Sequence, residues 1–213
     1  MMEKYHKIET LYVRDEKTKK LIVGDFRNKT VEFLKDNTWQ FTEKVDGTNI
    51  RVHWDGHNVI FGGRTDNAQI PAHLINRLNE LFGGEANAQL FEQKFGETPV
   101  TLFGEGYGPK IQSGGAYRND VDFILFDVLI GDDLYLEREN VEDIAKYFGI
   151  DVVPIVLEGT IQDGVDYVTK GDRKSIIAQN GALIEGLVGR PKIELRDRRG
   201  ERIIVKIKYK DFE

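Results

Sequence analysis

Apolar and polar residues alternate along much of the chain, and short apolar runs interrupt the alternation. Both patterns are typical of β-strands, in which successive side chains point to opposite faces of a sheet. An Asp55-Gly56 pair between two such stretches indicates a tight hairpin turn. The predicted strands lie within residues 8–13, 20–26, 39–45, 49–64, 99–108, 121–136, 151–159, 182–191 and 202–210.

Fewer stretches repeat their apolar residues at helical spacing. These predict helices over residues 72–83, 89–96, 140–149 and 171–180. Strands outnumber helices and do not alternate strictly with them, which favours an α+β fold with antiparallel sheets flanked by helices. Because no repeat, linker or low-complexity tract interrupts the 213 residues, we expect a single domain over residues 1–213.

Composition narrows the class of protein. The absence of cysteine excludes disulfides, zinc ribbons and thiol catalysis. No apolar run approaches the roughly 20 residues of a membrane span, and no secretory signal is visible, so we expect a cytoplasmic protein without membrane contact. The net charge is −6, but residues 190–213 hold nine Lys or Arg against five Asp or Glu. This basic segment suits a phosphate-rich ligand, although a solvated strand gives the same pattern.

The stretch KVDGTN, residues 44–49, follows a predicted strand. Lys44 and Asp46 are two residues apart, so on a strand they would share a face. Gly47 would let the backbone leave the strand and approach a ligand closely. A surface Lys-Asp pair ahead of a turn produces the same letters, so this motif does not decide the function by itself.

Four further motifs carry polar or aromatic residues on or beside predicted strands. In isolation, a turn glutamate or an edge strand also explains these motifs, and for Phe126 a core aromatic is the better interpretation. Together with Lys44 they match a nucleoside triphosphate and a divalent metal, because carboxylates hold the metal or its waters and lysines neutralise phosphate oxygens. No Walker loop is present. The residues are Glu105 in GEG, Phe126 in FILFDV, Glu185 in EGLV, and Lys206 and Lys208 in VKIK.

The order KVDGTN, FGEG, FILFDV, EGLV, VKIK resembles the covalent nucleotidyltransferases, which are the ATP-dependent RNA and DNA ligases and the mRNA capping enzymes. Glu43 before the lysine and the segment FGEGYGPKIQ look most like the nick-sealing, phage-type RNA ligases. The resemblance implies an ATP-grasp-like adenylation domain, and we expect no OB-fold or helical domain after it. A DNA ligase, a capping-type guanylyltransferase and a non-catalytic nucleotide- or nucleic-acid-binding module are the alternatives.

The resemblance also implies a reaction. Lys44 would be the nucleophile that takes AMP from ATP, and Lys206 and Lys208 would contact the phosphates. AMP would pass to a 5′-phosphate, and a 3′-hydroxyl would then displace it. Asp46 would hold a metal-bound water or orient the 3′-hydroxyl. Ligands of Mg²⁺ or Mn²⁺ are implied at Asp46, Glu105 and Glu185.

Contacts with the nucleotide and the nucleic acid are implied for five further positions. The expected partners are nucleic-acid ends, in a nicked RNA duplex or an RNA/DNA hybrid, and the expected state is a monomer in the cytoplasm, or in the host cytoplasm for a viral source. The positions are Glu43 beside the adenine, Asn49 at the 5′-phosphate, Arg64 at the ribose and the nucleic-acid end, Glu105 at the ribose hydroxyls, and Phe126 stacked on the adenine.

Overall fold

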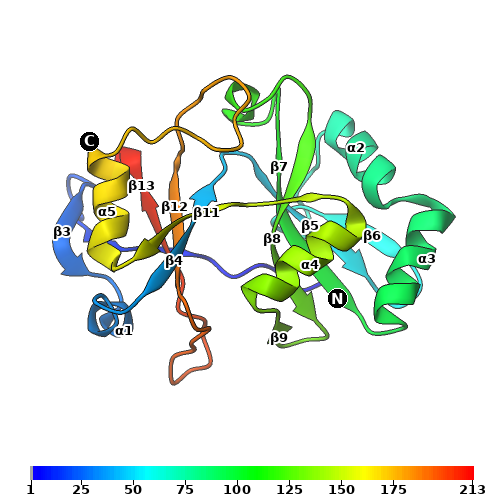
Figure 1. Cartoon of the computed structure of the whole chain (residues 1–213), viewed down its shortest axis with the longest axis horizontal. Coiled ribbons are helices and arrows are strands. Elements are labelled where there is room, and N and C mark those ends of the chain that lie inside the picture. The colour runs from blue at the N-terminus through cyan, green and yellow to red at the C-terminus, as the bar shows by residue number, and fades with distance from the viewer. Residues whose placement is uncertain (1) are drawn as a thin grey trace. The chain divides into compact units, whose positions relative to one another are not determined.

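The computed structural model describes residues 2–213, which form two compact units (Figure 1). Unit 1 consists of residues 2–6 and 46–153, and unit 2 of residues 7–45 and 154–213. Each unit has its own sheet and its own apolar core. The assignment of residues 1–213 to one adenylation domain stays a prediction.

Unit 1 is built on a six-stranded sheet in the order β10-β8-β7-β5-β6, with β9 paired to β8. All neighbours are antiparallel except β10, which runs parallel to β8. The strands are β5 (Thr48–Trp54), β6 (Val59–Gly62), β7 (Val100–Tyr107), β8 (Asp122–Ile130), β9 (Leu134–Tyr135) and β10 (Asp151–Val152).

Three helices of unit 1 contribute apolar side chains to one cluster with alternate residues of β5, β7 and β8. They are α2 (Ala72–Phe82), α3 (Gly84–Phe95) and α4 (Arg138–Phe148), and a short 3-10 turn, η1, covers Gly114–Ala116. Leu74, Leu78 and Phe82 are fully buried, as the helical spacing of this stretch predicts. The remaining residues of β5 and β7 point to the opposite, more polar face of the sheet.

The N-terminal residues 2–6 are tied to unit 1 by a buried arginine. Arg51 on β5 is only 1% exposed, and its guanidinium donates to the carbonyl oxygens of Gly63, Met2 and Glu3. The hydroxyl of Tyr5 donates to the buried carboxylate of Asp127 over 2.7 Å. These bonds satisfy groups that would be costly to bury unpaired.

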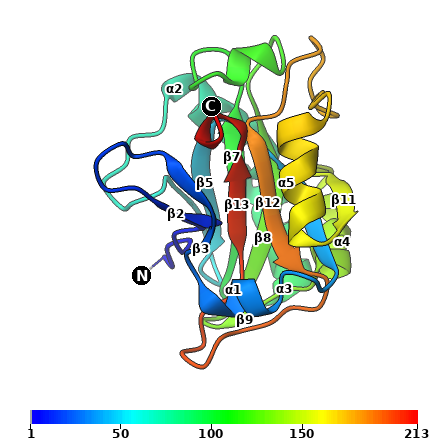
Figure 2. The same ribbon diagram turned by 90° about the vertical axis from the view of Figure 1, so that its left-hand side faces the viewer.

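Unit 2 contains a five-stranded sheet in the order β1-β13-β12-β4-β11, in which only β1 and β13 are parallel (Figure 2). Its strands are β1 (Glu9–Thr10), β4 (Trp39–Lys44), β11 (Ile155–Gly159), β12 (Gly186–Pro191) and β13 (Val205–Lys208). A separate hairpin pairs β2 (Tyr12–Arg14) with β3 (Leu21–Phe26), and α1 (Lys29–Phe33), α5 (Ile161–Lys170) and the 3-10 turn η2 (Tyr209–Asp211) complete the unit.

Helix α5 packs against β12 over the core of unit 2. A Cβ added at Gly164 on α5 or at Gly189 on β12 would lie 2.6 Å from the Phe41 ring. Both positions therefore need glycine, because the aromatic ring of β4 fills the space between helix and sheet.

The α+β class with antiparallel sheets is confirmed, but one helix was predicted in the wrong place. Residues 171–180 form an irregular loop, and the helix is α5, which immediately precedes them. Thr160 and Asp163 form a capping box at its start, and Ile161, Val165 and Val168 are buried at helical spacing. Helix α3 begins at Gly84, five residues before its predicted start, and α1 was not predicted.

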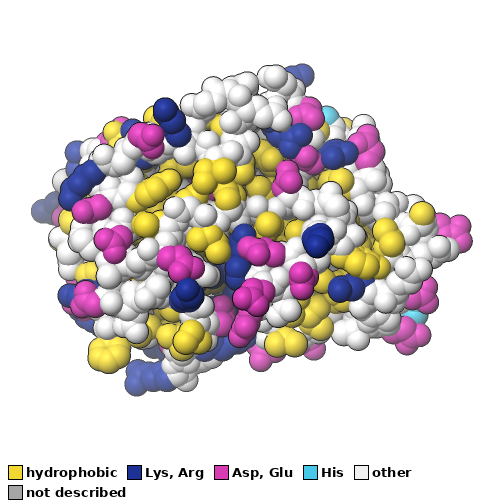
Figure 3. Space-filling view, viewed as in Figure 1, with side chains coloured by type: hydrophobic (Ala, Val, Ile, Leu, Met, Phe, Trp, Pro, Cys, Tyr) yellow, Lys and Arg dark blue, Asp and Glu magenta, His cyan; other side chains and the backbone are white. Residues whose placement is uncertain are grey.

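Acidic and basic side chains are interspersed with apolar ones over the face drawn in Figure 3. Within residues 2–213, the helices are all too short or too polar to cross a bilayer.

Candidate active site

The nucleophile candidate lies in a row of residues across three neighbouring strands of unit 2. Lys44 at the end of β4 is directly opposite Gly186 on β12, and Gly186 is opposite Lys208 on β13. In the next row on the same face, Val188 on β12 is opposite Lys206 on β13. Because residues two apart on a strand share a face, all three lysines lie on one side of the sheet. Sequence alternation predicted this arrangement for the two lysines of β13.

Glu185 joins two of these lysines. The Nζ of Lys44 is 2.5 Å from one carboxylate oxygen of Glu185, and the Nζ of Lys208 pairs with the other. Burial alone would raise the pKa of Glu185, but the charges and hydrogen bonds of Lys44 and Lys208 outweigh it and lower that pKa. Burial lowers the pKa of Lys206, and the nearby charges of Lys208 and Lys44 lower it further. The cluster therefore concentrates positive charge around one carboxylate.

Gly186 allows the lysine row to form. A Cβ at this position would lie 2.1 Å from the carbonyl oxygen of Ile207 and 2.8 Å from the Cα of Lys208. Any larger residue would push β12 and β13 apart, so the glycine beside Glu185 serves the spacing of the two strands.

Glu43 faces the core side of β4, opposite to Lys44, and is 1% exposed. Its carboxylate accepts hydrogen bonds from the Ser175 hydroxyl and from the backbone N–H of Ile176, over 3.0 Å for the latter. Burial raises the pKa of Glu43, although these bonds act in the opposite direction. The predicted contact of Glu43 with adenine stays a prediction. Its hydrogen bonds to the loop 171–185 were not predicted.

Replacing Glu43 by glutamine is expected to change how the free energy of unfolding depends on pH. A carboxyl group whose pKa is raised by folding stabilises the folded chain below its unfolded pKa, and this stabilisation is lost as the pH rises through the folded pKa. From its ordinary value of 4.5 upward, the wild type should lose stability relative to Glu43→Gln, by at most about 1.4 kcal/mol per pH unit. Urea unfolding at unit steps from about pH 4 to pH 7 measures the difference.

Glu158→Gln is the matched control. Glu158 is an exposed carboxyl on the same sheet, and hydrogen bonds from Lys192 and Gln40 lower its pKa, so its contribution has the opposite sign. Parallel pH profiles for the wild type and Glu43→Gln would show that the Glu43 pKa is not raised.

On unit 1, Asn49 on β5 is directly opposite Glu105 on β7. Both lie on the polar face, because the neighbouring Gly104 and Gly106 face the core, where a Cβ would lie 2.3 Å from the Phe123 ring or 2.4 Å from the Leu74 side chain. The Oδ1 of Asn49 is buried and has no hydrogen-bond partner among residues 2–213. An acceptor left in this state suits a ligand donor.

Phe126 is the extra residue of a β-bulge. Phe103 on β7 is opposite Asp127, but the next residue, Gly104, is opposite Leu125, so Phe126 has no partner in the register. The Phe126 side chain is half-buried, and the Tyr5 ring lies 5.0 Å away in an edge arrangement. A bulge re-aims a side chain, and this explains how a mid-strand aromatic stays out of the main core.

One expectation about the KVDG motif was wrong. Strand β4 ends at Lys44 and Asp46 belongs to unit 1, so strand alternation does not place Lys44 and Asp46 on one face. Gly47 lies close to β7, since a Cβ there would lie 2.3 Å from the Gly106 carbonyl oxygen, and its approach to a ligand stays a prediction. Arg64 is exposed in the loop after β6 and makes no hydrogen bond or ion pair within the described part of the chain.

The sequence profile of the RNA ligase family matches residues 37–208. The chain belongs to the RNA ligase family. The match covers Lys44 on β4, Glu185 just before β12 and Lys208 on β13, and it confirms the predicted family. The phage-type branch and the nick-sealing specificity stay predictions.

Solved structures of Naegleria gruberi RNA ligase have a similar fold. A mutant with ATP and Mn aligns with a TM-score of 0.64 at 18% identity, over 86% of this chain and 52% of that chain. The enzyme with PPi gives 0.62 at 20% identity, over 86% and 53%. An apo mutant gives 0.62 at 18% identity, over 84% and 51%. The RNA ligase family member described here thus spans about half the length of those chains, and the likeness shows the fold. No curated protein matches the chain.

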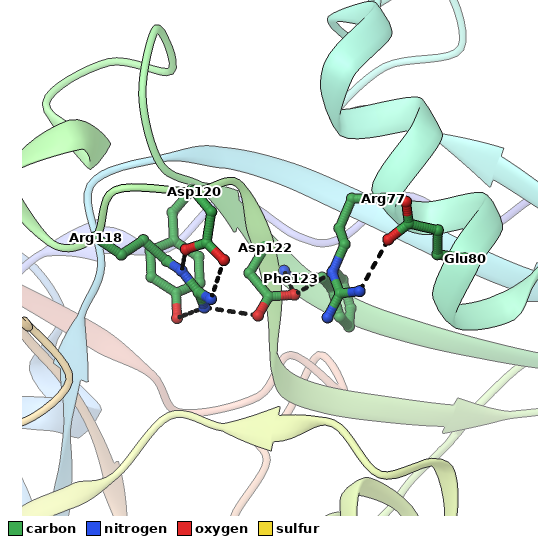
Figure 4. A network of polar contacts seen from close by, with 7 residues as sticks. Arg77, Glu80, Arg118, Asp120, Asp122 and Phe123 are labelled. Atoms are coloured by element: carbon green, nitrogen blue, oxygen red, sulfur yellow. Dashed lines mark hydrogen bonds and ion pairs between the residues drawn. The ribbon is translucent and has the colours of Figure 1, made fainter.

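A polar network fixes the segment that follows Glu105 in this family member (Figure 4). Arg118 donates to Asp120 over 2.6 Å, to Asp122 over 2.6 Å and to the Tyr107 hydroxyl over 3.2 Å. Arg77 on α2 donates to the same Asp122. The network links the end of β7, the start of β8 and α2, and sequence reasoning missed it because its members come from separate segments.

A metal ion would find few protein ligands. Among residues 2–213 no three Asp, Glu, His or Cys side chains are grouped so that they could hold a metal ion. Mg²⁺ commonly keeps several waters and takes only one or two carboxylates together with nucleotide phosphates. In unit 2, Glu185 beside Lys44 and Lys208 is a carboxylate suited to a metal that arrives with a nucleotide.

Proposed function

We propose that the chain is an ATP-dependent RNA ligase that joins a 3′-hydroxyl to a 5′-phosphate through a lysyl-AMP intermediate. The observation that carries the proposal is the contact of Lys44 with Glu185, on a sheet face that also bears Lys206 and Lys208. A nucleophilic amine needs a rigid support and nearby positive charge for the attacked phosphate, and this cluster supplies both.

In the first step, the neutral Nζ of Lys44 attacks the α-phosphorus of ATP. A P–N bond forms, the bond from the α-phosphorus to its bridging oxygen breaks, pyrophosphate leaves, and the amine loses a proton. Lys206 and Lys208 stabilise the charge that develops on the phosphate oxygens. Glu185 orients the Nζ of Lys44 before the reaction.

In the second step, an oxygen of an RNA 5′-phosphate attacks the phosphorus of lysyl-AMP, the P–N bond breaks, and Lys44 is restored. In the third step, the oxygen of a 3′-hydroxyl attacks the 5′-phosphorus and the phosphodiester bond forms. The bond from that phosphorus to the AMP oxygen breaks, AMP leaves, and the hydroxyl proton passes to solvent. Asp46 is proposed to orient that hydroxyl, and Asn49 to bind the 5′-phosphate.

The remaining contacts with the nucleotide are proposed from the same resemblance. Glu105 binds the ribose hydroxyls, Phe126 stacks on the adenine, and Arg64 contacts the ribose and the nucleic-acid end. Glu43 lines the adenine site together with the loop that its carboxylate holds. Mg²⁺ or Mn²⁺, when bound, neutralises phosphate charge, and the proposed ligands, one or two at a time beside the nucleotide phosphates, are Asp46, Glu105 and Glu185.

The proposed substrate is a nick in an RNA duplex or an RNA/DNA hybrid, sealed by a monomer in the cytoplasm. The experiment is to incubate the chain with ATP and Mg²⁺ and a duplex that carries a labelled 5′-phosphate at the nick, and then to resolve the strands under denaturing conditions. We expect a longer labelled strand when both nick ends are RNA, and none when the upstream strand lacks its 3′-hydroxyl.

Three outcomes separate the alternatives. If the protein sealed only nicks in which both strands are DNA, its activity would be that of a DNA ligase and not of an RNA ligase. Labelling of the protein by GTP in place of ATP would indicate a guanylyltransferase. Failure to seal both a 5′-phosphorylated and a pre-adenylylated RNA end would contradict ligation altogether.

A further inference from the structure

The loop 171–185 of unit 2 is held against the strands of the lysine cluster at two points. The first is Glu43, whose carboxylate accepts hydrogen bonds from Ser175 and Ile176. The second is Arg173, whose guanidinium carbon lies 3.4 Å from the centroid of the Tyr209 ring. The loop follows α5, which ends at Lys170 (Figure 1).

Tyr209 connects this stack to the cluster. It directly follows Lys208, and its backbone N–H donates to the carbonyl oxygen of Glu185 over 3.2 Å. The carboxylate of the same Glu185 pairs with Lys44 and Lys208. The guanidinium of Arg173 is therefore stacked on the residue next to the proposed phosphate contacts.

Arg173 is held in place without using its side-chain donors. The half-buried guanidinium makes no hydrogen bond or ion pair with any residue from 2 to 213. Stacking on the ring face leaves the N–H groups at its edge open, and this fork matches a phosphate or carboxylate in two parallel bonds.

The backbone of Arg173 also departs from ordinary values. Its φ is +52°, which residues other than glycine rarely adopt. The loop fixes this conformation, because the N–H of Ile184 donates to the Arg173 carbonyl oxygen over 2.8 Å and Lys174 forms a β-bridge with Leu183. Strained positions that the surrounding structure holds in place occur mainly at functional sites.

We infer that Arg173 is a further phosphate-binding residue of the lysine cluster, oriented by its stack on Tyr209. The inference rests on the proposed function. A phosphate reaches such a cluster from two sources, which are the β- and γ-phosphates that leave ATP as pyrophosphate and the 5′-phosphate of an RNA end. Both present oxygens to the same guanidinium fork, so separate probes distinguish them.

The test is isothermal titration of the full chain with inorganic pyrophosphate, and separately with a 5′-phosphorylated RNA oligonucleotide and its 5′-hydroxyl counterpart. Arg173→Gln should weaken binding of at least one phosphate probe by about tenfold or more, as expected when a charged hydrogen-bond donor is lost. Arg173→Lys should weaken it less, because it keeps the charge but not the fork. The neighbouring exposed Lys174→Gln is the matched control and should bind as the wild type does.

A loss confined to pyrophosphate assigns Arg173 to the nucleotide, and a loss confined to the 5′-phosphorylated RNA assigns it to the substrate end. Wild-type binding of both probes by Arg173→Gln overturns the inference, as does an equal loss in Lys174→Gln. If Arg173→Gln unfolds by circular dichroism, Arg173→Lys decides in the same way. Labelling of the wild type by α-labelled ATP is measured alongside, since its absence would mean that the proposed function has failed and not only the role of Arg173.

Discussion

Replacing Lys44 by alanine is expected to reduce the transfer of label from α-labelled ATP to the protein by at least about a thousandfold. The reason is that Lys44 is the one lysine of the cluster that lies at the end of β4, in contact with Glu185 and opposite Gly186. Lys206 and Lys208 are on β13, which β12 separates from β4, and they would still bind phosphate. The measurement is denaturing electrophoresis after incubation with Mg²⁺, using protein first stripped of any bound AMP with pyrophosphate.

Two controls make this result specific to the nucleophile. Lys170→Ala removes a lysine of unit 2 whose side chain is 71% exposed, and it should leave the labelling unchanged. Lys44→Ala should still seal an RNA end that already carries AMP, because the third step does not need the lysine nucleophile. A labelled band of normal intensity in Lys44→Ala, or none in the wild type with ATP, GTP or NAD, would contradict the proposed mechanism.

Replacing Gly186 by alanine is expected to lower the free energy of unfolding by about 3 kcal/mol and to reduce labelling of Lys44 with it. The added Cβ would lie 2.1 Å from the Ile207 carbonyl oxygen, which belongs to the backbone and has no rotamer to change. Relief requires β12 and β13 to separate, and that separation also displaces Lys208 from Glu185. Urea unfolding followed by tryptophan fluorescence measures the loss, because Trp39 is buried on the adjacent strand β4.

Gly115→Ala is the matched control for this substitution. A Cβ at Gly115 would approach no atom closer than the 3.4 Å to Pro109, an ordinary contact. Its stability and labelling should therefore equal those of the wild type. Equal stability of Gly186→Ala and Gly115→Ala would show that the spacing of β12 and β13 tolerates a methyl group and that the glycine has another role.

The amino-acid sequence by itself determined the strands of the site and the faces of several of its residues. Alternation in VKIK placed Lys206 and Lys208 on one face, and the alternating stretch WQFTE before Lys44 predicted β4, because the two-residue period of a strand is a local property. The two glycines around Glu105 were visible as a motif. Their reason, which is contact with Phe123 and Leu74, was not visible.

Only the tertiary structure decided how these pieces combine. The 171–180 stretch was predicted as a helix because its local pattern permits one, but it is held as a loop by the hydrogen bonds that Ser175 and Ile176 donate to Glu43 and by the stack of Arg173 on Tyr209. The register that aligns Lys44 with Gly186 and Lys208 joins β4 to strands more than a hundred residues further along the chain. The burial of Glu43 and the bulge at Phe126 likewise depend on neighbours that no local period encodes. Local periodicity determines on which face of a strand a side chain lies, whereas long-range packing determines which residues it contacts on that face.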